Sequence, residues 1–388
     1  MKICHVITRM IVGGAQENTL FTIKGHLENG HETVLVTGPT EGPEGRLLQH
    51  QKLPNLKVEV LENLQREIHW TSEFSTIKEL ERIFRRESFD VVHTHSSKAG
   101  ILGRIAAKRC NIPVIVHTVH GQSFHQYQSN FKNRIFIMAE RFAAKRCHRI
   151  FAVADAMIDQ CVEAGIAPRT KYQTVYSGMD LEPYLNSPRD EELAKELNIS
   201  DDTFVVGKIA RLFELKGHKY LIKAAAAVIE EIPNIKFLLI GDGILRQELS
   251  DQIEAAGLKD YFIFTGLVDP SEIPRYVGLM DVLVHLSLRE GLARTLVQAM
   301  AAKVPVVSYK IDGAPEVVID GETGYLCAPE SDLAVSAALV KLYKDPETRK
   351  EMGIIGQDFV RIKWDWHTMV TQLEAAYEEL LENSQRQN

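Results

Sequence analysis

The sequence has no apolar run of the roughly 18–20 residues that a helix needs to span a bilayer, so we do not expect an integral membrane protein. Its five cysteines are scattered and include no C-x-x-C pair, which argues against a disulfide framework and against a structural zinc site. Met1-Lys2 leads directly into a strand-like stretch, without the apolar segment and cleavage site of a secretory signal. These absences predict a cytoplasmic chain.

Fingerprints of common cofactors are missing as well. The loop Val12-Gly13-Gly14-Ala15 does not complete the G-x-G-x-x-G pattern of nicotinamide and flavin sites, and Lys216-Gly217 is not part of a Walker A loop. We therefore expect no bound cofactor and no nucleic-acid partner.

What the sequence does contain is a repeated alternation of short β-branched runs and amphipathic helical stretches, which is typical of a parallel sheet wrapped by helices. Its 388 residues exceed the roughly 250–300 that one hydrophobic core accommodates. The predicted fold class is α/β, with two Rossmann-like domains whose parallel sheets face a central cleft. We place the first domain at 1–180, a linker at 181–200, the second domain at 201–363 and a C-terminal helix, which crosses back to the first domain, at 364–388.

The predicted elements divide between the two halves of the chain. The first half has strands at 3–8, 33–37, 58–61, 91–95, 114–119, 150–153 and 174–176, with helices at 15–29, 72–87, 98–110, 129–147 and 155–164. The second has strands at 204–209, 236–240, 262–265, 282–285, 304–307 and 324–327, a last helix at about 368–382, and a tail at 383–388 predicted to be disordered. Residues 1–187 carry a net charge of +4 and the remainder −11, which suits the halves to different partners.

Two candidate groups follow strands of the first half. Gly13 and Gly14 open the first helix, where backbone amides can approach an anionic group, although a tight turn that needs glycine explains them equally well. His120 follows the fifth strand, at the sheet edge where open parallel sheets bind ligands. A packed or surface histidine is the alternative, but His93 and His95 end an adjacent strand.

Charged residues follow two strands of the second half. Arg211 and Lys216 come after its first strand, and a planar guanidinium beside a compact ammonium suits the oxygens of a diphosphate. Two solvated surface charges are the alternative. Glu290 and Gly291 form a turn after a later strand, and the helix that begins near Arg294 directs its free amides toward whatever Glu290 contacts. This combination suits a nucleotide sugar, whereas a glutamate that only caps its own helix leaves the cations unexplained.

Over nearly its whole length the sequence resembles the retaining glycosyltransferases of the GT-B fold, family 4, also called glycosyl transferases group 1. The matching landmarks are Gly13-Gly14, His120, Gly207 through Arg211, Lys216-Gly217, Leu239 through Gly243, Phe264 through Gly266 and the block from Glu290. The resemblance implies that Arg211 and Lys216 clamp the donor diphosphate and that Glu290 contacts hydroxyls of the donor sugar. We also expect His120 to act in catalysis, and the donor to bind against Gly13, Gly14, Gly241, Gly291, Leu292, Ala293, Arg294, Thr295 and Gln298.

The sequence departs from the family pattern at the donor. The second glutamate of the family's E-x7-E motif, which holds the nucleotide ribose, is Gln298 here, and an amide lacks the charge that strengthens such a bond. Ala293 and Thr295 stand where glycine and proline are more usual, and Tyr176 to Asp180 replaces a P-N-G-V-D-like turn.

The resemblance implies retaining transfer of a hexose-type sugar from a UDP- or GDP-sugar to a sugar or lipid-linked acceptor, in polysaccharide or glycolipid biosynthesis. It also implies that no metal is required. The sequence agrees, because Asp155 and Asp159 fall on a predicted surface helix and no D-x-D-like pair lies where a donor-bound cation would need it. A nucleotide-sugar epimerase of the same fold and a non-catalytic subunit are the alternatives.

The segment Lys132–Arg149 combines six cations with one acid and several large apolar residues. A helix with basic and apolar faces can lie on an anionic bilayer, where each cation contributes about 1 kcal/mol. A sheet-covering helix with solvated charges is the alternative. Because many similar transferases act on lipid-linked acceptors, we expect peripheral contact with the inner face of the cell membrane.

Overall fold

The computed structural model describes residues 1–388 except 12, 41–52, 66, 68–69 and 387–388. The chain divides into two compact units, one made of Met1–Met179 and Trp364–Asn388 and the other of Asp180–Lys363. The stretch 181–200, predicted as a linker, lies inside the second unit, where the short helices α7 (Glu182–Leu185) and α8 (Glu191–Glu196) form. The prolines and charged residues of this stretch therefore belong to short helices of the second unit and do not form an extended linker.

The first unit contains a seven-stranded parallel sheet with the order β3-β2-β1-β4-β5-β6-β7. Its strands are β1 (Lys2–Ile7), β2 (Glu32–Thr37), β3 (Lys57–Val60), β4 (Val91–His95), β5 (Val114–Val119), β6 (Arg149–Ala152) and β7 (Tyr172–Thr174). The central strands β1, β4 and β5 are almost entirely buried, which explains their continuous runs of β-branched residues.

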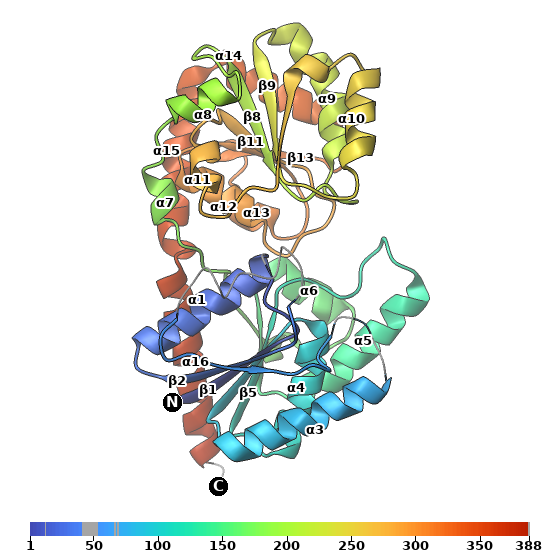
Figure 1. Ribbon diagram of the computed structural model, residues 1–388, viewed down its shortest axis with the longest axis vertical. Helices are drawn as coiled ribbons and strands as arrows, with labels where there is room; N and C mark the ends of the chain where they lie inside the picture. Colours follow the sequence, from blue (N-terminus) through green and yellow to red (C-terminus); the bar gives the residue numbers. More distant parts are fainter. Residues whose placement is uncertain (12, 41–52, 66, 68–69, 387–388) are drawn as a thin grey trace. The chain divides into compact units, whose positions relative to one another are not determined.

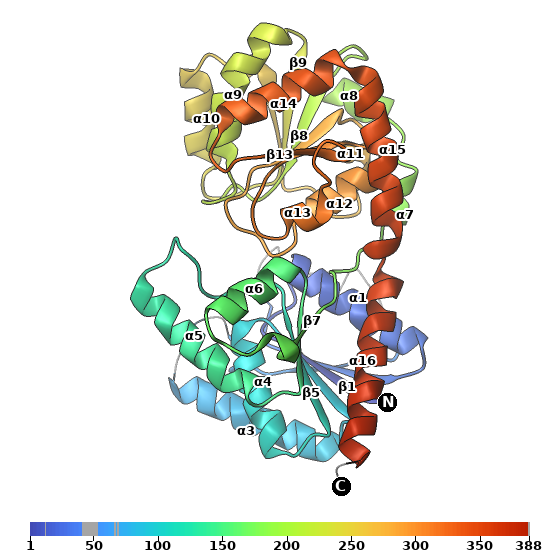
Figure 2. The same ribbon diagram turned by 180° about the vertical axis from the view of Figure 1, so that it is seen from behind.

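Helices cover both faces of this sheet (Figures 1 and 2). One face packs against α1 (Gly14–Glu28) and α16 (Trp366–Arg386), so the C-terminal helix completes the core of the first unit. The other face carries α3 (Trp70–Glu87), α4 (Ser97–Arg109), α5 (Asn130–Ala144) and α6 (Asp155–Glu163). Gly25 lets α1 and α16 approach closely, since a Cβ atom at that position would lie 2.5 Å from the Val370 side chain.

The second unit contains a six-stranded parallel sheet with the order β10-β9-β8-β11-β12-β13. Its strands are β8 (Phe204–Ile209), β9 (Ile235–Ile240), β10 (Phe262–Gly266), β11 (Val282–His285), β12 (Val306–Tyr309) and β13 (Gly324–Cys327). Besides α7 and α8, its helices are α9 (His218–Glu231), α10 (Arg246–Ala255), α11 (Ile273–Val277), α12 (Arg294–Ala301), α13 (Ala314–Val317), α14 (Asp332–Lys344) and α15 (Pro346–Lys363).

Several predicted boundaries differ from the structure by a few residues, as for β7, which covers Tyr172–Thr174 rather than 174–176, and two of the differences have a physical reason. Strand β12 begins at Val306 rather than at residue 304, because Pro305 has no N–H with which to enter the ladder beside β11. The tail predicted to be disordered continues α16 as far as Arg386, where an ion pair with Glu382, one turn earlier, supports the last turn.

Both sheets reverse their strand order at one place, between β1 and β4 in the first unit and between β8 and β11 in the second. In open parallel sheets this switch point, at the carboxyl ends of the strands, is where ligands bind. The fold therefore predicts that ligands bind at the loops that follow β1, β4, β8 and β11.

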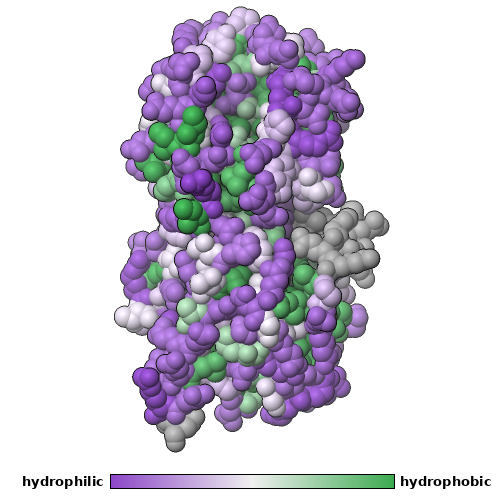
Figure 3. Space-filling model, turned by 90° about the vertical axis from the view of Figure 1, so that its left-hand side faces the viewer, coloured by the Kyte–Doolittle hydropathy of each residue, from purple (hydrophilic) through white to green (hydrophobic). Residues whose placement is uncertain are grey.

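The described helices include none that is both long and apolar enough to span a membrane. On the face drawn in Figure 3, hydrophilic side chains predominate and apolar side chains lie in small, separate groups.

Candidate active site

An ion pair between Lys216 and Glu290 joins the loops that follow β8 and β11, at the switch point of the second sheet. His285 ends β11, and its Nε2 atom lies 3.7 Å from Oε1 of Glu290. Its Nδ1 atom lies 3.3 Å from the hydroxyl of Thr295, in the first turn of α12. The backbone N–H of Glu290 donates to the carboxylate of Asp312 at 2.7 Å. Four separate loops and strand ends thus meet around Glu290, and two of them, through Lys216 and His285, reach its carboxylate.

The environment of Glu290 keeps it ionised. Burial by itself would raise the pKa of Glu290, but the charge of Lys216, together with the nearby His285 and hydrogen bonds from Lys216 and Ser287, outweighs burial and lowers that pKa. Burial lowers the pKa of His285 to about 3, so this imidazole is neutral at neutral pH. The site therefore presents one carboxylate, one ammonium and one neutral ring.

Two glycines allow the loops of this site to approach the strand ends. A Cβ atom on Gly217, whose φ is +74°, would lie 1.8 Å from the carbonyl oxygen of Leu286, just after β11. A Cβ atom on Gly241, whose φ is +130°, would lie 2.3 Å from the carbonyl oxygen of Ala210, next to Arg211. Only glycine fits such positions without strain, and both residues belong to the motifs singled out in the sequence.

The remaining donor candidates surround this centre. Arg211 is exposed, with its guanidinium 5.1 Å from the ring centre of Phe213. Gly291, Leu292 and Ala293 are buried in the turn before α12, which begins at Arg294 without a side-chain cap from Ala293. Gln298 is half-buried on the same helix. The side chain of Ala293 therefore does not cap the first turn of α12, whose amides open toward the end where an anion can bind.

In the first unit, His120 follows β5 and is held by a chain of histidines. Its Nε2 atom lies 3.0 Å from Nδ1 of His95, and Nε2 of His95 lies 3.0 Å from Nδ1 of His5. His93 lies beside this chain and bonds the hydroxyls of Tyr377 and Thr118, each at 2.6 Å. These residues come from β1, β4, β5 and α16, so His120 is fixed from beneath the sheet edge.

Burial lowers the pKa of His5, His93 and His95 far below the usual value, so these rings are neutral. Their ligand atoms lie within 4.8 Å of one another, a spacing compatible with a metal ion. However, five of their six ring nitrogens already make hydrogen bonds, which a metal would have to displace. The sequence alone indicates no clear role for His93 and His95, whereas in the structure His95 supports His120 and His93 packs beside His95.

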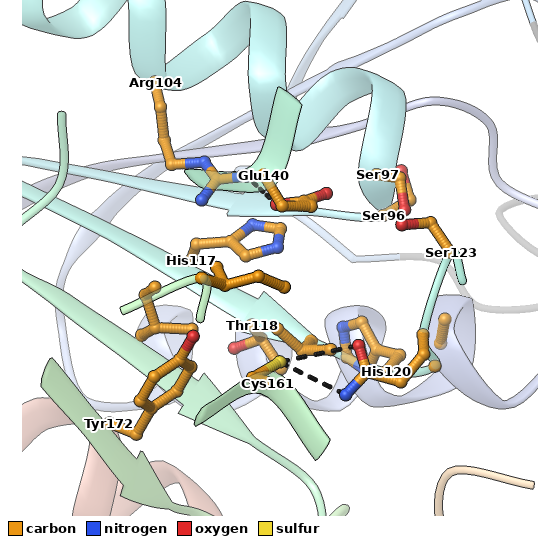
Figure 4. A pocket seen from close by; sticks show the side chains of 16 residues that line it. Ser96, Ser97, Arg104, His117, Thr118, His120, Ser123, Glu140, Cys161 and Tyr172 are labelled. Atoms are coloured by element: carbon orange, nitrogen blue, oxygen red, sulfur yellow. Dashed lines mark hydrogen bonds and ion pairs between the residues drawn. The ribbon is translucent and has the colours of Figure 1, made fainter. Parts of the chain in front are cut away.

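His120 also lines a pocket of about 320 Å³ within the first unit (Figure 4). Ser96 and Ser97, where α4 begins, line the same side of the pocket. On the opposite side the fully buried Arg104 donates to Glu140 at 2.7 Å. The walls between are largely apolar, so the pocket suits a ligand with both polar and apolar parts.

The first loop lies beside this pocket. Gly13 precedes α1 as a cap residue without a side chain, Gly14 is the first residue of that helix, and Ala15 lines the pocket. The hydroxyl of Thr8, at the end of β1, lies 2.8 Å from that of Ser96 after β4. Gly13, Gly14 and His120 therefore belong to the switch-point side of the first unit, whereas the cations and Glu290 belong to the second.

Asp155 and Asp159 lie on the surface of α6, as predicted, and both pair with Arg169. These two carboxylates therefore form ion pairs on the surface of the first unit.

Two doubly wound units, each with polar groups at its switch point, define a two-domain protein of the GT-B type. The family description Glycosyltransferase Family 4 matches residues 12–183, and the description Glycosyl transferases group 1 matches residues 189–359. The two matches together cover nearly the whole chain, and the protein belongs to this group of glycosyltransferases.

Individual proteins agree with this assignment. A UDP-Gal:alpha-D-GlcNAc-diphosphoundecaprenol alpha-1,3-galactosyltransferase of Escherichia coli is 28% identical over 89% of this chain and 88% of its own length. The capsular polysaccharide biosynthesis glycosyltransferase CapM of Staphylococcus aureus is 25% identical over 83% of this chain and 85% of its own. A crystal structure of Anabaena HepE in complex with UDP-glucose has a TM-score of 0.83 at 24% identity, and covers 98% of this chain and 100% of that one. The predicted GT-B fold and family are thereby confirmed.

Proposed function

We propose that the protein transfers a hexose-type sugar, with retention of configuration and without a metal ion, from a nucleotide-sugar donor to an acceptor in polysaccharide or glycolipid biosynthesis. The observation that carries the proposal is the ion pair of Lys216 and Glu290 at the switch point of the second sheet, with the exposed Arg211 in the same loop as Lys216. UDP is the first nucleotide to test, because the E. coli relative uses UDP-Gal and the Anabaena protein binds UDP-glucose. GDP is the second.

The paired charges suit the two ends of such a donor. In the free protein Lys216 and Glu290 bind each other. A bound donor would place its diphosphate against Lys216, Arg211 and the amides that open α12, and its sugar hydroxyls against the ionised Glu290. When the bond to the sugar breaks, negative charge grows on the departing diphosphate, and preorganised cations and amides stabilise that charge most in the transition state.

The pocket beside His120 is the proposed acceptor site. It holds hydroxyl groups at the opening of α4, a histidine at the end of β5 and largely apolar walls. A sugar carried on a lipid likewise has a polar part, the sugar, and an apolar part, the lipid chain. The acceptor of the E. coli relative, a diphosphoundecaprenol-linked sugar, is of this chemical class.

Helix α5 presents an apolar stripe made of Phe131, Ile135, Met138 and Phe142, which are 48% to 74% exposed. Their spacing of four, three and four residues places them on one face of the helix. Of all the residues in α5, only Ala143 and Ala144 are buried, so most of this helix does not serve as core.

Charge favours an anionic membrane as the partner of this stripe. Lys132, Arg134 and Lys145 are exposed around it. Glu140, the one acid of the segment, is directed to Arg104. We therefore propose that α5 rests on the inner face of the cell membrane, where a lipid-linked acceptor is found, and that the enzyme is cytoplasmic.

An assay of nucleotide release from UDP-, GDP- and ADP-sugars, with and without a membrane extract that contains acceptors, tests the function. Release that requires the extract, together with NMR evidence that the product keeps the anomeric configuration of the donor, supports the proposal. Activity abolished by EDTA contradicts metal independence. Conversion of the donor sugar without acceptor indicates an epimerase, and an absence of turnover with every donor indicates a non-catalytic subunit.

A further inference from the structure

Beneath the proposed diphosphate site lie buried polar atoms that have no hydrogen-bond partner. Nζ of Lys208 and both ring nitrogens of His218 account for three of the twelve such atoms among the described residues. An unmade buried hydrogen bond costs about 1–3 kcal/mol, so folded proteins rarely group several together. Their position at the end of β8 and the start of α9, next to the loop that carries Lys216, points to a role in binding.

Lys208 lies inside the core of the second unit. It pairs with Leu239 in the ladder between β8 and β9, and strand alternation places it on the same face as Phe204 and Val206. These two residues belong to the apolar core that the second sheet forms with α9 and α14. Lys208 is 1% exposed, so its ammonium cannot reach bulk water.

The groups around Lys208 leave it short of negative charge. Burial in the first place, and then repulsion from Lys216, lower the pKa of Lys208 to about 7, with partial compensation by Glu290. His218 is neutral, because burial and the charges of Lys208 and Lys216 lower its pKa to about 2. His285 on β11 is neutral as well. Glu290 is the one acid that acts on Lys208, and Lys216 already binds it.

We propose that Lys208 couples donor binding to the uptake of one proton, and serves in its charged form as a third cation for the diphosphate behind Arg211 and Lys216. The inference rests on the proposed function, since it needs the diphosphate to bind at the end of β8. The proton comes from solvent and converts the neutral amine of Lys208 to ammonium. Lys208 need not touch the donor, because two negative charges a short distance away in the protein interior favour the ammonium form.

The proposal makes the binding of nucleotides depend on pH. When pH rises above 7 the free protein loses the proton of Lys208 while the complex keeps it. Affinity for the nucleotide therefore falls by up to about tenfold per pH unit in this range. With half-protonation at about pH 7, the free protein is roughly 90% neutral at Lys208 at pH 8, and binding should take up about 0.9 proton there.

Calorimetric titration of the full chain with UDP at pH 8, in buffers of different ionisation enthalpy, counts this proton. At pH 8 the terminal phosphate of UDP, with a second pKa of about 6, is already ionised and adds little to the count. The Lys208→Met variant should bind UDP without the uptake of a proton and should show a flat pH dependence between 7 and 9. Lys236→Met is the matched control, because Lys236 is the second residue of the neighbouring strand β9 and donates to the carbonyl of Asp260 at 2.5 Å, at the opposite end of the strands from the site.

The inference is overturned if the wild type takes up almost no proton on binding UDP, or if wild type and Lys208→Met take up the same number. In either case, binding of UDP itself still supports the proposed function. Failure of both UDP and GDP to bind the wild type at any pH overturns the proposed function and the inference with it. A Lys208→Met protein that does not fold is replaced by Lys208→Arg. Arginine stays charged at every pH used, so this variant should bind without proton uptake and without the loss of affinity above pH 7.

Discussion

The Nδ1 atom of His95 lies 3.0 Å from the Nε2 atom of His120, which ties a pocket residue to a ring that is wholly buried. Because a neutral imidazole has one donor and one acceptor, the protons along His5, His95 and His120 must all point the same way. Whether Nε2 of His120 donates or accepts is therefore coupled to the tautomers of His95 and His5, which are buried beneath it.

Replacement of His95 by leucine should consequently lower kcat by about 10²-fold through misplacement of His120, and leave the KM for the donor nearly unchanged. The effects of His95→Leu and His120→Ala should not add in a double-mutant cycle, because both remove the same interaction. Steady-state kinetics on the two single variants and the double variant test this, with circular dichroism as the control for folding. Additive losses would show that the two histidines act independently.

Arg211→Ala and Lys216→Ala should each lower turnover by ~10²-fold or more, about 3 kcal/mol, because each removes a charge that stabilises the leaving diphosphate. Lys216→Ala should also raise the pKa of Glu290, which loses its counterion, and move the acidic limb of the pH–rate profile to higher pH. Lys219→Ala, on the exposed side of α9, is the control. Near wild-type rates for both variants at saturating donor would refute the assignment of the donor site.

Gln298→Glu should tighten the binding of the nucleotide by roughly 1 kcal/mol, since a carboxylate accepts a ribose hydroxyl more strongly than an amide does. The residue is half-buried on α12, eight positions after Glu290, so a carboxylate fits the same space. Titration with UDP measures the change. Markedly weaker binding would mean that the amide of Gln298 donates its hydrogen to the ligand.

The triple variant Phe131→Ser, Ile135→Ser, Met138→Ser should lose co-sedimentation with vesicles that contain anionic lipid, because it removes most of the apolar stripe of α5. High salt should weaken the binding of the wild type, since cations supply part of the attraction. Leu333→Ser and Ile362→Ser remove comparably exposed apolar side chains from the second unit and should change nothing. Wild-type protein that stays in the supernatant at low salt would favour a soluble acceptor.

The free energy of unfolding should rise with pH above about 7 through the contribution of Lys208. Its pKa is about 7 in the folded chain and 10.5 in the unfolded one, so the unfolded state binds the extra proton between these values. Stability therefore increases across this window by up to about 1.4 kcal/mol per pH unit. Urea unfolding at several pH values should show a smaller slope for Lys208→Met than for the wild type. Equal slopes would mean that Lys208 is not desolvated in the folded protein.

The sequence predicts the fold well because each element carries a local pattern. Buried strands such as Val91–His95 show unbroken runs of β-branched residues, and the glycines at 217 and 241 mark turns that no other residue fits. Local pattern also singles out the donor candidates in the sequence, since Arg211, Lys216 and Glu290 each follow a strand that ends at the switch point.

The histidine chain is not predictable in this way. His5, His95 and His120 are separated by 90 and 25 positions and become neighbours only because β1, β4 and β5 pair in register. Lys208 is visible in the sequence as a lone cation within the apolar strand Phe204–Ile209. That its Nζ atom has no hydrogen-bond partner, however, depends on the packing of α9. The exposure of α5 likewise depends on which residues the rest of the unit leaves uncovered.

The return of α16 to the first unit has a consequence for biosynthesis of the chain. Ile3, Val91 and Val114 pack against Trp366, Leu373 and Tyr377, which the ribosome adds only after the whole second unit. A nascent chain that has passed residue 179 therefore holds a sheet with one apolar face covered by α1 but not yet by α16, whereas the second unit is encoded in one continuous stretch. The first unit, whose synthesis begins before that of the second, is thus completed after it.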